Sequence, residues 1–389
     1  MKDTRQWQVD PQQATTEAVA EAVVPAAAIL RQGGLVAFPT ETVYGVGANA
    51  LDAQAVQAIF AAKGRPADNP LIVHIADWAA LTPLITGLPP LAKRLAECFW
   101  PGPLTLILPA SPLVPAEVTA GLPTVAVRWP AHPVAEALIR AAGVPVAAPS
   151  ANRSGKPSPT DAVHVLEDLG GRIDGIVDGG PCAVGVESTV LDVTVDPPAI
   201  LRPGGITADM LRPLLPGGRL QGEGVSEQER AGEPVGDPVG EAPRAPGMKY
   251  THYAPSADVF LLPGPWEAQV ALLRRTIAAP PAGGTLGLLI SEETLRELGD
   301  LLVRPESAEG VLYRSGHLIV GIVGRRGQLT TVAKKLFRAL RAFDHTDAAM
   351  IVAETYPAEG IGAALMNRLC KSAGGRVWPA GNPAYNVRR

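Results

Sequence analysis

The sequence predicts an α/β protein made of two domains and a linker. Short apolar segments alternate with segments of helical periodicity over most of the 389 residues, as is typical of strands interleaved with helices. The chain is too long for one ordinary hydrophobic core. Gly, Pro, Glu and Gln dominate residues 216–244, and an aromatic segment follows. We therefore expect a first domain at 13–215, a flexible linker at 216–255 and a smaller α/β domain at 256–389.

The first domain is expected to contain a mixed sheet with helices packed on it. Residues 1–12 are polar and are expected to form a loose tail before an alanine-rich helix at 18–32. Some neighbouring strands lack an intervening helix, which favours a mixed sheet over a purely parallel one. Strands are expected at 35–38, 71–75, 104–108, 124–128, 144–148, 175–178, 188–193 and 199–201, with helices at 52–63, 91–99, 134–142 and 160–169.

The second domain shows the same alternation on a smaller scale. The clearest helix is 329–343, which carries an apolar stripe at helical spacing. Strand–helix alternation in this part of the chain predicts an open α/β layer. The strands are expected at 259–262, 286–290, 318–322 and 348–353, and the last helix at 361–371.

Composition restricts the class of protein. Hydrophobic residues make up 47% of the chain and charged residues 19%, as in a well-buried globular protein. The formal net charge of −4 argues against broad electrostatic binding of nucleic acid, although a local basic cleft in an acidic protein stays open as an alternative. Cys98, Cys182 and Cys370 form no CxxC pair, which favours reduced thiols over a disulfide frame or a zinc site. Because no signal peptide or membrane-spanning run is evident, we expect a cytoplasmic protein that does not enter a membrane.

The stretch 35–69 organises the first domain. An apolar strand runs into a loop of hydroxyl residues and glycines, and a helix that Asp52 can cap and Gly64 can end follows it. Lys63 and Arg65 are thereby expected at the edge of the sheet from which the Thr40 loop leaves. A lysine point charge beside a planar guanidinium suits a polyphosphate. The plainer alternative is a solvated helix end.

Several other polar residues are expected at the ends of strands. Ser150 and Asn152 follow the strand 144–148, where small polar groups suit phosphate or metal–water contacts, although an ordinary turn is the alternative. Thr124 and Arg128 fall on one face of a strand, because side chains alternate. His74 lies within an apolar strand, where a hydrogen-bonded core histidine is the usual interpretation.

Other nucleotide sites are not supported by the sequence. Residues 45–50 (GVGANA) fit the dinucleotide pattern on paper, but Thr40 to Tyr44 separate them from the preceding strand. No P-loop is present. The serines have no sequence-evident histidine partner, and the six histidines show no metal-ligand spacing. The chemistry is therefore expected to depend on positioning and charge neutralisation, as phosphoryl and nucleotidyl transfer do.

Taken together, the motifs resemble L-threonylcarbamoyladenylate synthase in its long, two-domain form. The resemblance extends from about residue 32 to residue 369. It implies a YrdC-like mixed twisted sheet with helices, joined by a linker to a smaller Rossmann-like α/β domain. The matching segments are 38–47 (FPTETVYGVG), 63–66 (KGRP), 69–71 (NPL), 100–105 (WPGPLT), 127–128 (VR), 148–155 (APSANRSG), 158–160 (SPT), 187–190 (ESTV), 201–204 (LRPG), 252–255 (HYAP) and 360–369 (GIGAALMNRL).

The resemblance implies a nucleotidyltransferase that makes threonylcarbamoyl-AMP and pyrophosphate from L-threonine, bicarbonate and ATP with Mg²⁺. The product would pass to a tRNA threonylcarbamoyl transferase complex for modification next to the anticodon. Lys63 and Arg65 are implied as catalytic, and no metal ligands from the protein are implied. Threonine would be held by Thr40, His74, Arg128, Ala148 and Ser188, although Ala148 offers only its backbone where some relatives have a hydroxyl. ATP would be held by Arg65, Asn69, Thr124, Ser150, Asn152, Ser158, Arg202 and Tyr253.

Two other functions are weighed against the synthase. A non-catalytic RNA-binding module would use the same basic surface, and the acidic net charge counts against it. Carbamoyl transfer onto another protein, as in hydrogenase-maturation enzymes, would require zinc-finger cysteine pairs that the sequence lacks. A further hypothesis is that residues 250–255 fold over the nucleotide as a gate.

Overall fold

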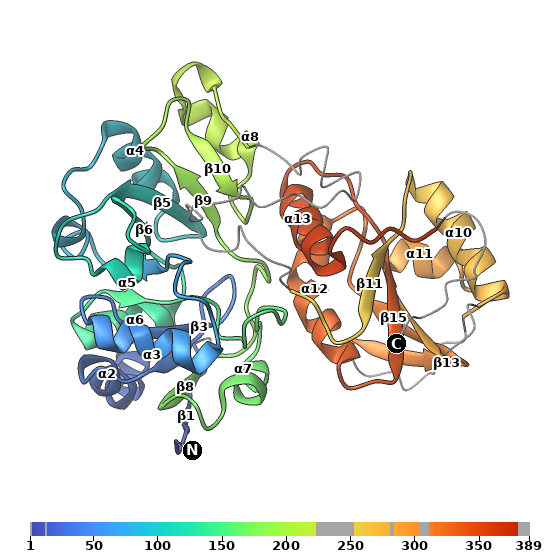
Figure 1. Ribbon diagram of the computed structural model, residues 1–389, viewed down its shortest axis with the longest axis horizontal. Coiled ribbons are helices and arrows are strands. Elements are labelled where there is room, and N and C mark those ends of the chain that lie inside the picture. The colour runs from blue at the N-terminus through green and yellow to red at the C-terminus, as the bar shows by residue number, and fades with distance from the viewer. Residues whose placement is uncertain (1, 12–13, 223–252, 281–283, 303–310, 380–389) are drawn as a thin grey trace. The chain divides into compact units, whose positions relative to one another are not determined.

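The structure, a computed structural model, describes residues 2–11, 14–222, 253–280, 284–302 and 311–379. They form two compact units (Figure 1): residues up to 154 together with 158–222 make the first, and the residues from 253 onward belong to the second. Most of the expected linker, 223–252, lies outside the described residues. Its first part does not: Gln221 accepts a hydrogen bond from the Ile200 amide at 2.8 Å, within the first unit.

The first unit is built on one mixed sheet of ten strands. Its order is β1-β8-β2-β3-β7-β4-β6-β5-β9-β10, with parallel and antiparallel neighbours, as expected of a mixed sheet. The strands are β1 (Arg5–Gln8), β2 (Val36–Phe38), β3 (Gly45–Asn49), β4 (Ile72–His74), β5 (Leu104–Pro109), β6 (Thr124–Arg128), β7 (Val146–Ala147), β8 (Gly175–Asp178), β9 (Thr189–Asp192) and β10 (Ala199–Arg202).

Two strands correct the sequence prediction. Residues 1–12 are not a loose tail throughout, because β1 pairs in parallel with β8. The glycine-rich stretch after Tyr44 is not all loop, because β3 lies between β2 and β7. Glycine hides the strand pattern there: a Cβ on Gly47 would lie 2.6 Å from Val146 Cγ1 and 2.8 Å from Phe38 Cε1. The missing side chain lets the neighbouring strands pack closely.

Helices cover both faces of this sheet. Alternation along β2 sends Val36 and Phe38 into one core and Ala37 into the other. The first core also contains α1 (Thr16–Ala22), α2 (Val24–Arg31) and α6 (Pro133–Ala142). The second contains α3 (Ala53–Lys63), α4 (Pro90–Phe99), α5 (Ala116–Thr119), α7 (Ala162–Leu169) and α8 (Ala208–Leu211). The single helix expected at 18–32 is two helices, and Pro25 in the first turn of α2 fits the break.

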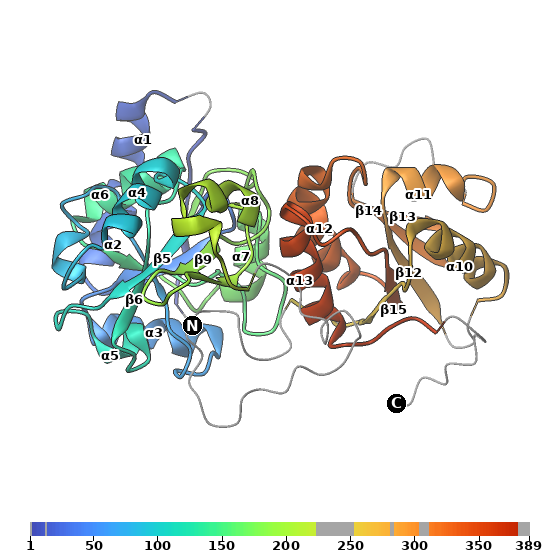
Figure 2. The same ribbon diagram turned by 90° about the horizontal axis from the view of Figure 1, so that it is seen from above.

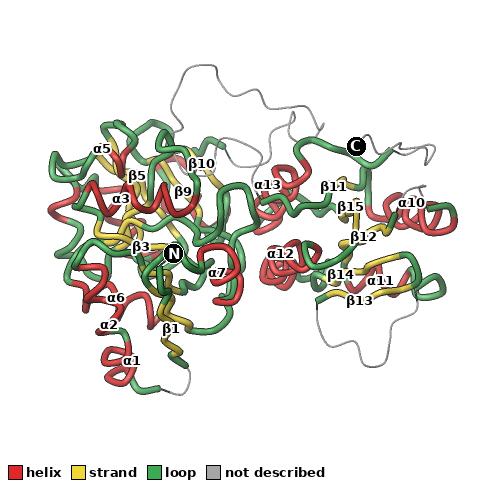
Figure 3. Tube along the Cα trace, turned by 60° about the horizontal axis from the view of Figure 1, so that its bottom comes forward, coloured by secondary structure: helices red, strands yellow, loops and turns green. Residues whose placement is uncertain are grey.

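The second unit is a three-layer α/β structure. Its sheet has the order β11-β15-β12-β14-β13, in which β11, β15, β12 and β14 are parallel and β13 is antiparallel. Figures 2 and 3 show α12 and α13 on one face of this sheet and α10 and α11 on the other. The elements are β11 (Asp258–Leu261), α10 (Trp266–Ala278), β12 (Thr285–Ile290), α11 (Glu292–Glu297), β13 (Leu312–Ser315), β14 (Leu318–Ile322), α12 (Leu329–Phe343), β15 (Ala348–Ala353) and α13 (Ile361–Ala373).

The open α/β layer expected for this part of the chain is confirmed, and β13 is an additional strand. It lies at one edge of the sheet, where among the described residues it pairs with β14, and Tyr313 is the one buried residue of the strand. Its short, partly charged sequence gives little apolar signal. Over the described ranges, no helix has the length and apolar character needed to cross a bilayer.

Gly204 allows the backbone at 204 to pack closely against the backbone at 187–189 in the first unit. A Cβ on Gly204 would lie 2.3 Å from the Thr189 amide nitrogen and 2.4 Å from the Glu187 carbonyl oxygen. These are backbone atoms, which a side-chain rotation cannot move away. We predict that Gly204→Ala destabilises the first unit by about 3 kcal/mol, in the range found for overpacked sites.

Denaturant titration followed by circular dichroism measures this change. Gly87→Ala is the matched control, because a Cβ there meets nothing within 4 Å. That substitution should stay within about 0.5 kcal/mol of the parent protein. Equal stability of the two variants would contradict the assigned backbone contact.

Candidate anion-binding site

Strand register brings three polar side chains together on one face of the first sheet. His74 on β4 lies opposite Arg128 on β6, and Arg128 lies opposite Thr105 on β5. Residues in register on adjacent strands point to the same face. Val146 on β7 continues the row beyond His74. Ala148, two residues further along the chain, is bonded to the same strand through its amide, which donates to the Ile72 carbonyl at 2.9 Å.

An apolar surface made by strands alone lies beside this row. Ile72, Ile107, Ala126 and Val190 form a separate buried cluster, with Leu201 packed against it. Ile72, Ala126 and Ile107 are two residues from His74, Arg128 and Thr105 respectively, so alternation places them on the same face. No described helix contributes to this cluster. The polar row therefore has an apolar neighbour on the sheet, as in many small-molecule sites.

Arg128 is held by acceptors from the loop that follows β2. Its Nη2 lies 2.7 Å from Glu41 Oε2, and its Nη1 donates to Thr42 Oγ1 at 3.0 Å. Both charged side chains are buried, with 4% and 11% of their surface exposed. The ion pair does not have hydrogen-bond geometry, and neither Glu41 oxygen has a hydrogen-bond partner among the described residues. The guanidinium is thus neutralised but incompletely bonded, which suits the exchange of one carboxylate for another.

The Thr40 hydroxyl is fixed in the same loop. Thr40 Oγ1 donates to the Val43 carbonyl at 2.7 Å and lies 2.8 Å from Thr42 Oγ1. It also accepts the amides of Thr42 and Val43 at 3.2 Å. Thr40 is 2% exposed. These bonds hold the loop in place. They join Thr40 to the Thr42 hydroxyl, which accepts the hydrogen bond from Arg128.

Ser188 and Arg202 extend the site across the next strands. Thr105 Oγ1 and Ser188 Oγ are 2.8 Å apart, and Arg202 Nη2 donates to Ser188 Oγ at 3.0 Å. Arg202 Nε donates to the Ser188 carbonyl at 3.1 Å. A β-bulge between Ile200 and Arg202 interrupts the pairing of β10 with β9. A bulge redirects side chains, so both Leu201 and Arg202 can serve the same face.

Lys63 occupies the end of α3, as the sequence predicts. Asp52 caps this helix by accepting the Gln54 and Ala55 amides, and Gly64 ends it with φ of 63°. The Lys63 ammonium donates to the Ser150 and Asn152 carbonyls, both at 2.5 Å, and the Ser150 hydroxyl lies 2.5 Å from Asn152 Oδ1. The helix end and the 150–152 loop are therefore one polar cluster.

The remaining predicted ATP ligands fall into separate places. Arg65 Nη2 lies 3.3 Å from the Asn69 and Pro70 carbonyls, so Arg65 and Asn69 are adjacent. The Ser158 hydroxyl donates to Glu187 Oε1, next to Ser188. Thr124 is at the far end of β6 from Arg128, about 13 Å away at the usual rise of a strand. Thr124 lies on the same face of the sheet as Arg128, and its role in binding ATP stays a prediction.

Tyr253 belongs to the second unit. It is 6% exposed, its ring centroid is 5.2 Å from that of Phe337, and the Arg368 guanidinium lies 5.7 Å from its ring. Its backbone φ is +69°, which is unusual for a residue other than glycine. The prediction that Tyr253 reaches the nucleotide stays a prediction, and so does the gate at 250–255, whose first residues lie outside the described ranges.

Four neighbours of the site were not singled out from the sequence: Glu41, Thr42, Thr105 and Glu187. All four lie inside the motifs that carry the resemblance. Alternation along 104–109 could have placed Thr105 on the face of Arg128 only once the pairing of β5 with β6 was known. Glu41 could have been found as the one carboxylate of the hydroxyl-rich loop, since a buried arginine requires a counter-charge.

His74 is held neutral by its surroundings. It is 4% exposed, and its Nδ1 lies 3.2 Å from the Ile72 carbonyl, to which it donates. Burial, and then the positive charge of Arg128, lower the pKa of His74 to about 3 from 6.5. Between these values the unfolded chain binds a proton that the folded protein does not, so His74 makes folding less favourable as the pH falls through this window.

We predict that the imidazole of His74 does not titrate between about pH 7.5 and about pH 5, since burial disfavours the charged ring. Histidine Cε1–H resonances followed by NMR over this range measure it. His74→Gln assigns the resonance, because the signal of His74 is absent from the spectrum of that variant. A His74 resonance that titrates at the ordinary histidine pKa would contradict the buried, neutral assignment.

The fold and the site define a class: an α/β protein with a candidate anion-binding site on one face of a mixed sheet, followed by a smaller open α/β unit. Among the described residues no group of three or more His, Cys, Asp or Glu side chains could hold a metal ion. Cys98, Cys182 and Cys370 form no disulfide among the described residues.

Comparison with known proteins makes the class specific. A family model described as "Telomere recombination" matches residues 28–204, and one described as "Threonylcarbamoyl-AMP synthase, C-terminal domain" matches residues 206–374. The chain is 49% identical to the threonylcarbamoyl-AMP synthase of Bacillus subtilis over 91% of this chain and 94% of the relative. Identity to that of Pyrococcus abyssi is 45%, over 90% and 94%.

A solved structure agrees with these relatives. The crystal structure of P. abyssi Sua5 complexed with L-threonine is 44% identical to this chain, with a TM-score of 0.81, and the match covers 96% of this chain and 99% of that one. The chain therefore belongs to the threonylcarbamoyl-AMP synthase family, in the two-domain form. The resemblance drawn from the sequence motifs is confirmed.

Proposed function

We propose that the first unit joins L-threonine, bicarbonate and ATP into threonylcarbamoyl-AMP with release of pyrophosphate. The observation that supports this proposal most strongly is the shared sheet face on which His74, Arg128 and Thr105 lie, extended by Ser188 and Arg202. Cations and hydroxyls collected there suit a reaction whose substrates and transition state are anionic. In this mechanism the enzyme acts as a nucleotidyltransferase.

Arg128 is proposed to bind the carboxylate of threonine. Its guanidinium is buried beside a carboxylate, Glu41, that has no hydrogen-bond partner among the described residues. A substrate carboxylate with bidentate geometry would replace an ion pair of poor geometry with two aligned hydrogen bonds. The Thr40 and Ser188 hydroxyls and neutral His74 would orient the rest of the amino acid, and Ala148 would contribute backbone only.

Lys63, Arg65 and Arg202 are proposed to neutralise the phosphates. Lys63 is fixed by two carbonyls of the 150–152 loop, so its charge is preorganised at the place where Ser150 and Asn152 are found. Preorganised cations stabilise developing negative charge without a reorganisation cost at the moment of reaction. Asn69, Ser158 and Thr124 would position the remainder of the nucleotide.

The proposed reaction proceeds without a covalent enzyme intermediate. Bicarbonate loses its hydroxyl group as hydroxide to give carbon dioxide. The threonine nitrogen takes up the carbon dioxide, giving a carbamate and a proton that combines with the hydroxide to form water. A carbamate oxygen then attacks the α-phosphorus of ATP. The bond from that phosphorus to the bridging oxygen of pyrophosphate breaks, and the leaving group departs with its electron pair. The protein's contribution is positioning and charge stabilisation.

Mg²⁺ is proposed to enter with ATP. The described residues hold no cluster of metal ligands, while Ser150 and Asn152 offer neutral oxygen atoms beside Lys63. Such a site fits an ion that takes most of its ligands from phosphates and water. The ion would supply charge neutralisation on the phosphates. We further propose a cytoplasmic location and transfer of the product to a tRNA threonylcarbamoyl transferase complex, with at most weak binding of tRNA itself.

Threonine-dependent release of pyrophosphate tests the activity directly. Purified protein with ATP, bicarbonate and Mg²⁺ should release pyrophosphate only when L-threonine is added. Lys63→Ala should lower the rate by about tenfold or more, since each about 1.4 kcal/mol lost from the transition state costs that factor. Lys93→Ala, on the exposed face of α4, is the charge-matched control and should retain the rate. Absence of threonine-dependent release would refute the proposed function.

Arg128→Lys separates charge from geometry. Lysine keeps the positive charge but cannot form the bidentate fork, so the KM for threonine should rise by about tenfold while the KM for ATP changes little. Steady-state kinetics with each substrate varied in turn measures both constants. Arg140→Lys, on the partly exposed side of α6, is the control. A rise confined to the KM for ATP would assign Arg128 to the nucleotide instead.

A further inference from the structure

The second unit concentrates polar residues where its parallel strands end. Glu354 follows β15, Ser291 follows β12, and Arg326 lies in the loop between β14 and α12. These three strands are parallel neighbours, so their carboxyl ends lie at one edge of the sheet. Helices leave this edge toward opposite faces, with α11 on one side and α12 on the other (Figures 2 and 3). In open α/β sheets, ligands bind at such edges.

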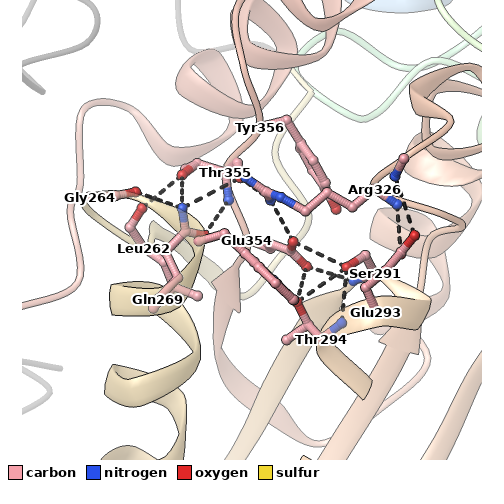
Figure 4. Close-up of polar contacts among 12 residues, drawn as sticks. Leu262, Gly264, Gln269, Ser291, Glu293, Thr294, Arg326, Glu354, Thr355 and Tyr356 are labelled. Atoms are coloured by element: carbon pink, nitrogen blue, oxygen red, sulfur yellow. Dashed lines mark hydrogen bonds and ion pairs between the residues drawn. The ribbon is translucent and has the colours of Figure 1, made fainter. Parts of the chain in front are cut away.

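Glu354 anchors the cluster and has no bonding capacity to spare. Its side chain is fully buried and accepts the Ser291 amide at 2.7 Å, the Ser291 hydroxyl at 3.1 Å and the Thr294 hydroxyl at 2.9 Å. It also accepts Arg326 Nη1 at 2.6 Å (Figure 4). Four donors saturate a carboxylate. Glu354 therefore positions Arg326 and does not call for a further cation.

Arg326 is held by hydrogen bonds at Nη1 and lies over two aromatic rings. Its Nη1 also donates to the Thr355 carbonyl at 2.7 Å. Its guanidinium carbon lies 6.0 Å from the centroid of the Trp266 ring and 5.4 Å from that of the Tyr356 ring. The other edge of the fork, Nε and Nη2, bonds to no side chain or backbone group of the described residues, and the side chain is 18% exposed. An arginine fixed in this way presents two parallel donors outward.

Tyr356 adds a third donor without a partner. The residue is 7% exposed, and its hydroxyl has no hydrogen-bond partner among the described residues. Burial, and then the Glu354 carboxylate, raise the pKa of Tyr356 well above its ordinary value, so the hydroxyl keeps its proton. Figure 4 shows the ring running from the backbone of Tyr356 toward Arg326, with its hydroxyl on the side of the cluster. A buried, unbonded hydroxyl is costly unless something pairs with it.

The other carboxylate nearby is also occupied. Glu293 accepts the Arg326 amide at 2.7 Å and the Gly327 amide at 3.3 Å. The unused groups of the cluster are thus donors, two on Arg326 and one on Tyr356, and the aromatic rings limit access to them. A set of donors in this arrangement recognises an acceptor with at least two oxygen atoms.

We propose that the second unit carries a binding site for an oxyanion, the carboxylate or phosphate group of a small molecule, on the outer edge of the Arg326 guanidinium and the Tyr356 hydroxyl. The site is independent of the reaction assigned to the first unit. It gives the second unit a ligand of its own at the edge of its parallel sheet.

Binding of inorganic phosphate and of acetate to the full-length chain tests the proposal. Line broadening of ³¹P for phosphate and saturation transfer to the methyl protons for acetate measure the dissociation constants, at constant ionic strength set with chloride. Tyr356→Phe removes a hydroxyl that bonds to no described residue, so the thermal melting temperature should hold while affinity for the bound probe falls by about fivefold. Arg326→Lys keeps a charge beside Glu354 and should weaken binding by about tenfold.

Arg325→Lys, in the same loop, is the matched control and should leave the affinity unchanged. Any binding of phosphate by the first unit is common to all these variants, because the substitutions lie in the second. Loss confined to phosphate identifies a phosphate-bearing ligand, and loss confined to acetate identifies a carboxylate. If neither Tyr356→Phe nor Arg326→Lys reduces the binding of either probe, the proposal is overturned, whatever the result of the pyrophosphate assay.

Discussion

Burial of the Arg128 guanidinium is the constraint on which the site in the first unit depends. An unpaired buried charge costs several kcal/mol, and breaking a buried pair by removing one partner costs about 3–5 kcal/mol. The fold meets this constraint with a carboxylate from Glu41 and a hydroxyl from Thr42, both delivered by the loop after β2. Strand register then places His74 and Thr105 on either side of the same guanidinium.

The surrounding bonds follow from that arrangement. The Thr105 hydroxyl is hydrogen-bonded to the Ser188 hydroxyl, and Arg202 donates a second hydrogen bond to the same Ser188 oxygen. The Ser188 hydroxyl is thus fixed by a charged neighbour and in turn fixes the Thr105 hydroxyl, and such support gives a site on a sheet precise geometry. Because the apolar residues Ile72 and Ala126 exclude water beside the row, electrostatic interactions there are stronger than at the surface.

Much of the fold could be predicted from periodicity and capping, because these are local signals. The helix α3, with Asp52 at its start and Gly64 at its end, is an example in which every local signal agrees. β3 could not be predicted, since Gly45 and Gly47 are selected by the tight packing of neighbouring strands and carry no strand propensity. β1 has exposed, polar residues, and its pairing with β8 is a contact between distant parts of the chain.

In the site, too, local features could be predicted from the sequence and features that depend on strand pairing could not. The residue types and their places at strand ends could be read from the sequence, and the family resemblance supplied the roles. The sequence could not show that Glu41 faces Arg128 or that a bulge lets Arg202 reach Ser188, because both depend on how strands pair. In the second unit, Arg326 and Tyr356 belong to no motif that the sequence analysis had singled out, and they are revealed by the meeting of the segments after β12, β14 and β15 at one edge of the sheet.

The central claim is that Arg128 exchanges its contact with Glu41 for the carboxylate of the amino-acid substrate. A crystal structure of this protein with L-threonine bound measures it most directly. The account predicts both carboxylate oxygens of threonine at hydrogen-bond distance from the Arg128 guanidinium, on the sheet face shared with His74 and Ser188. Threonine bound away from that face, with the Arg128–Glu41 ion pair unchanged, would contradict it.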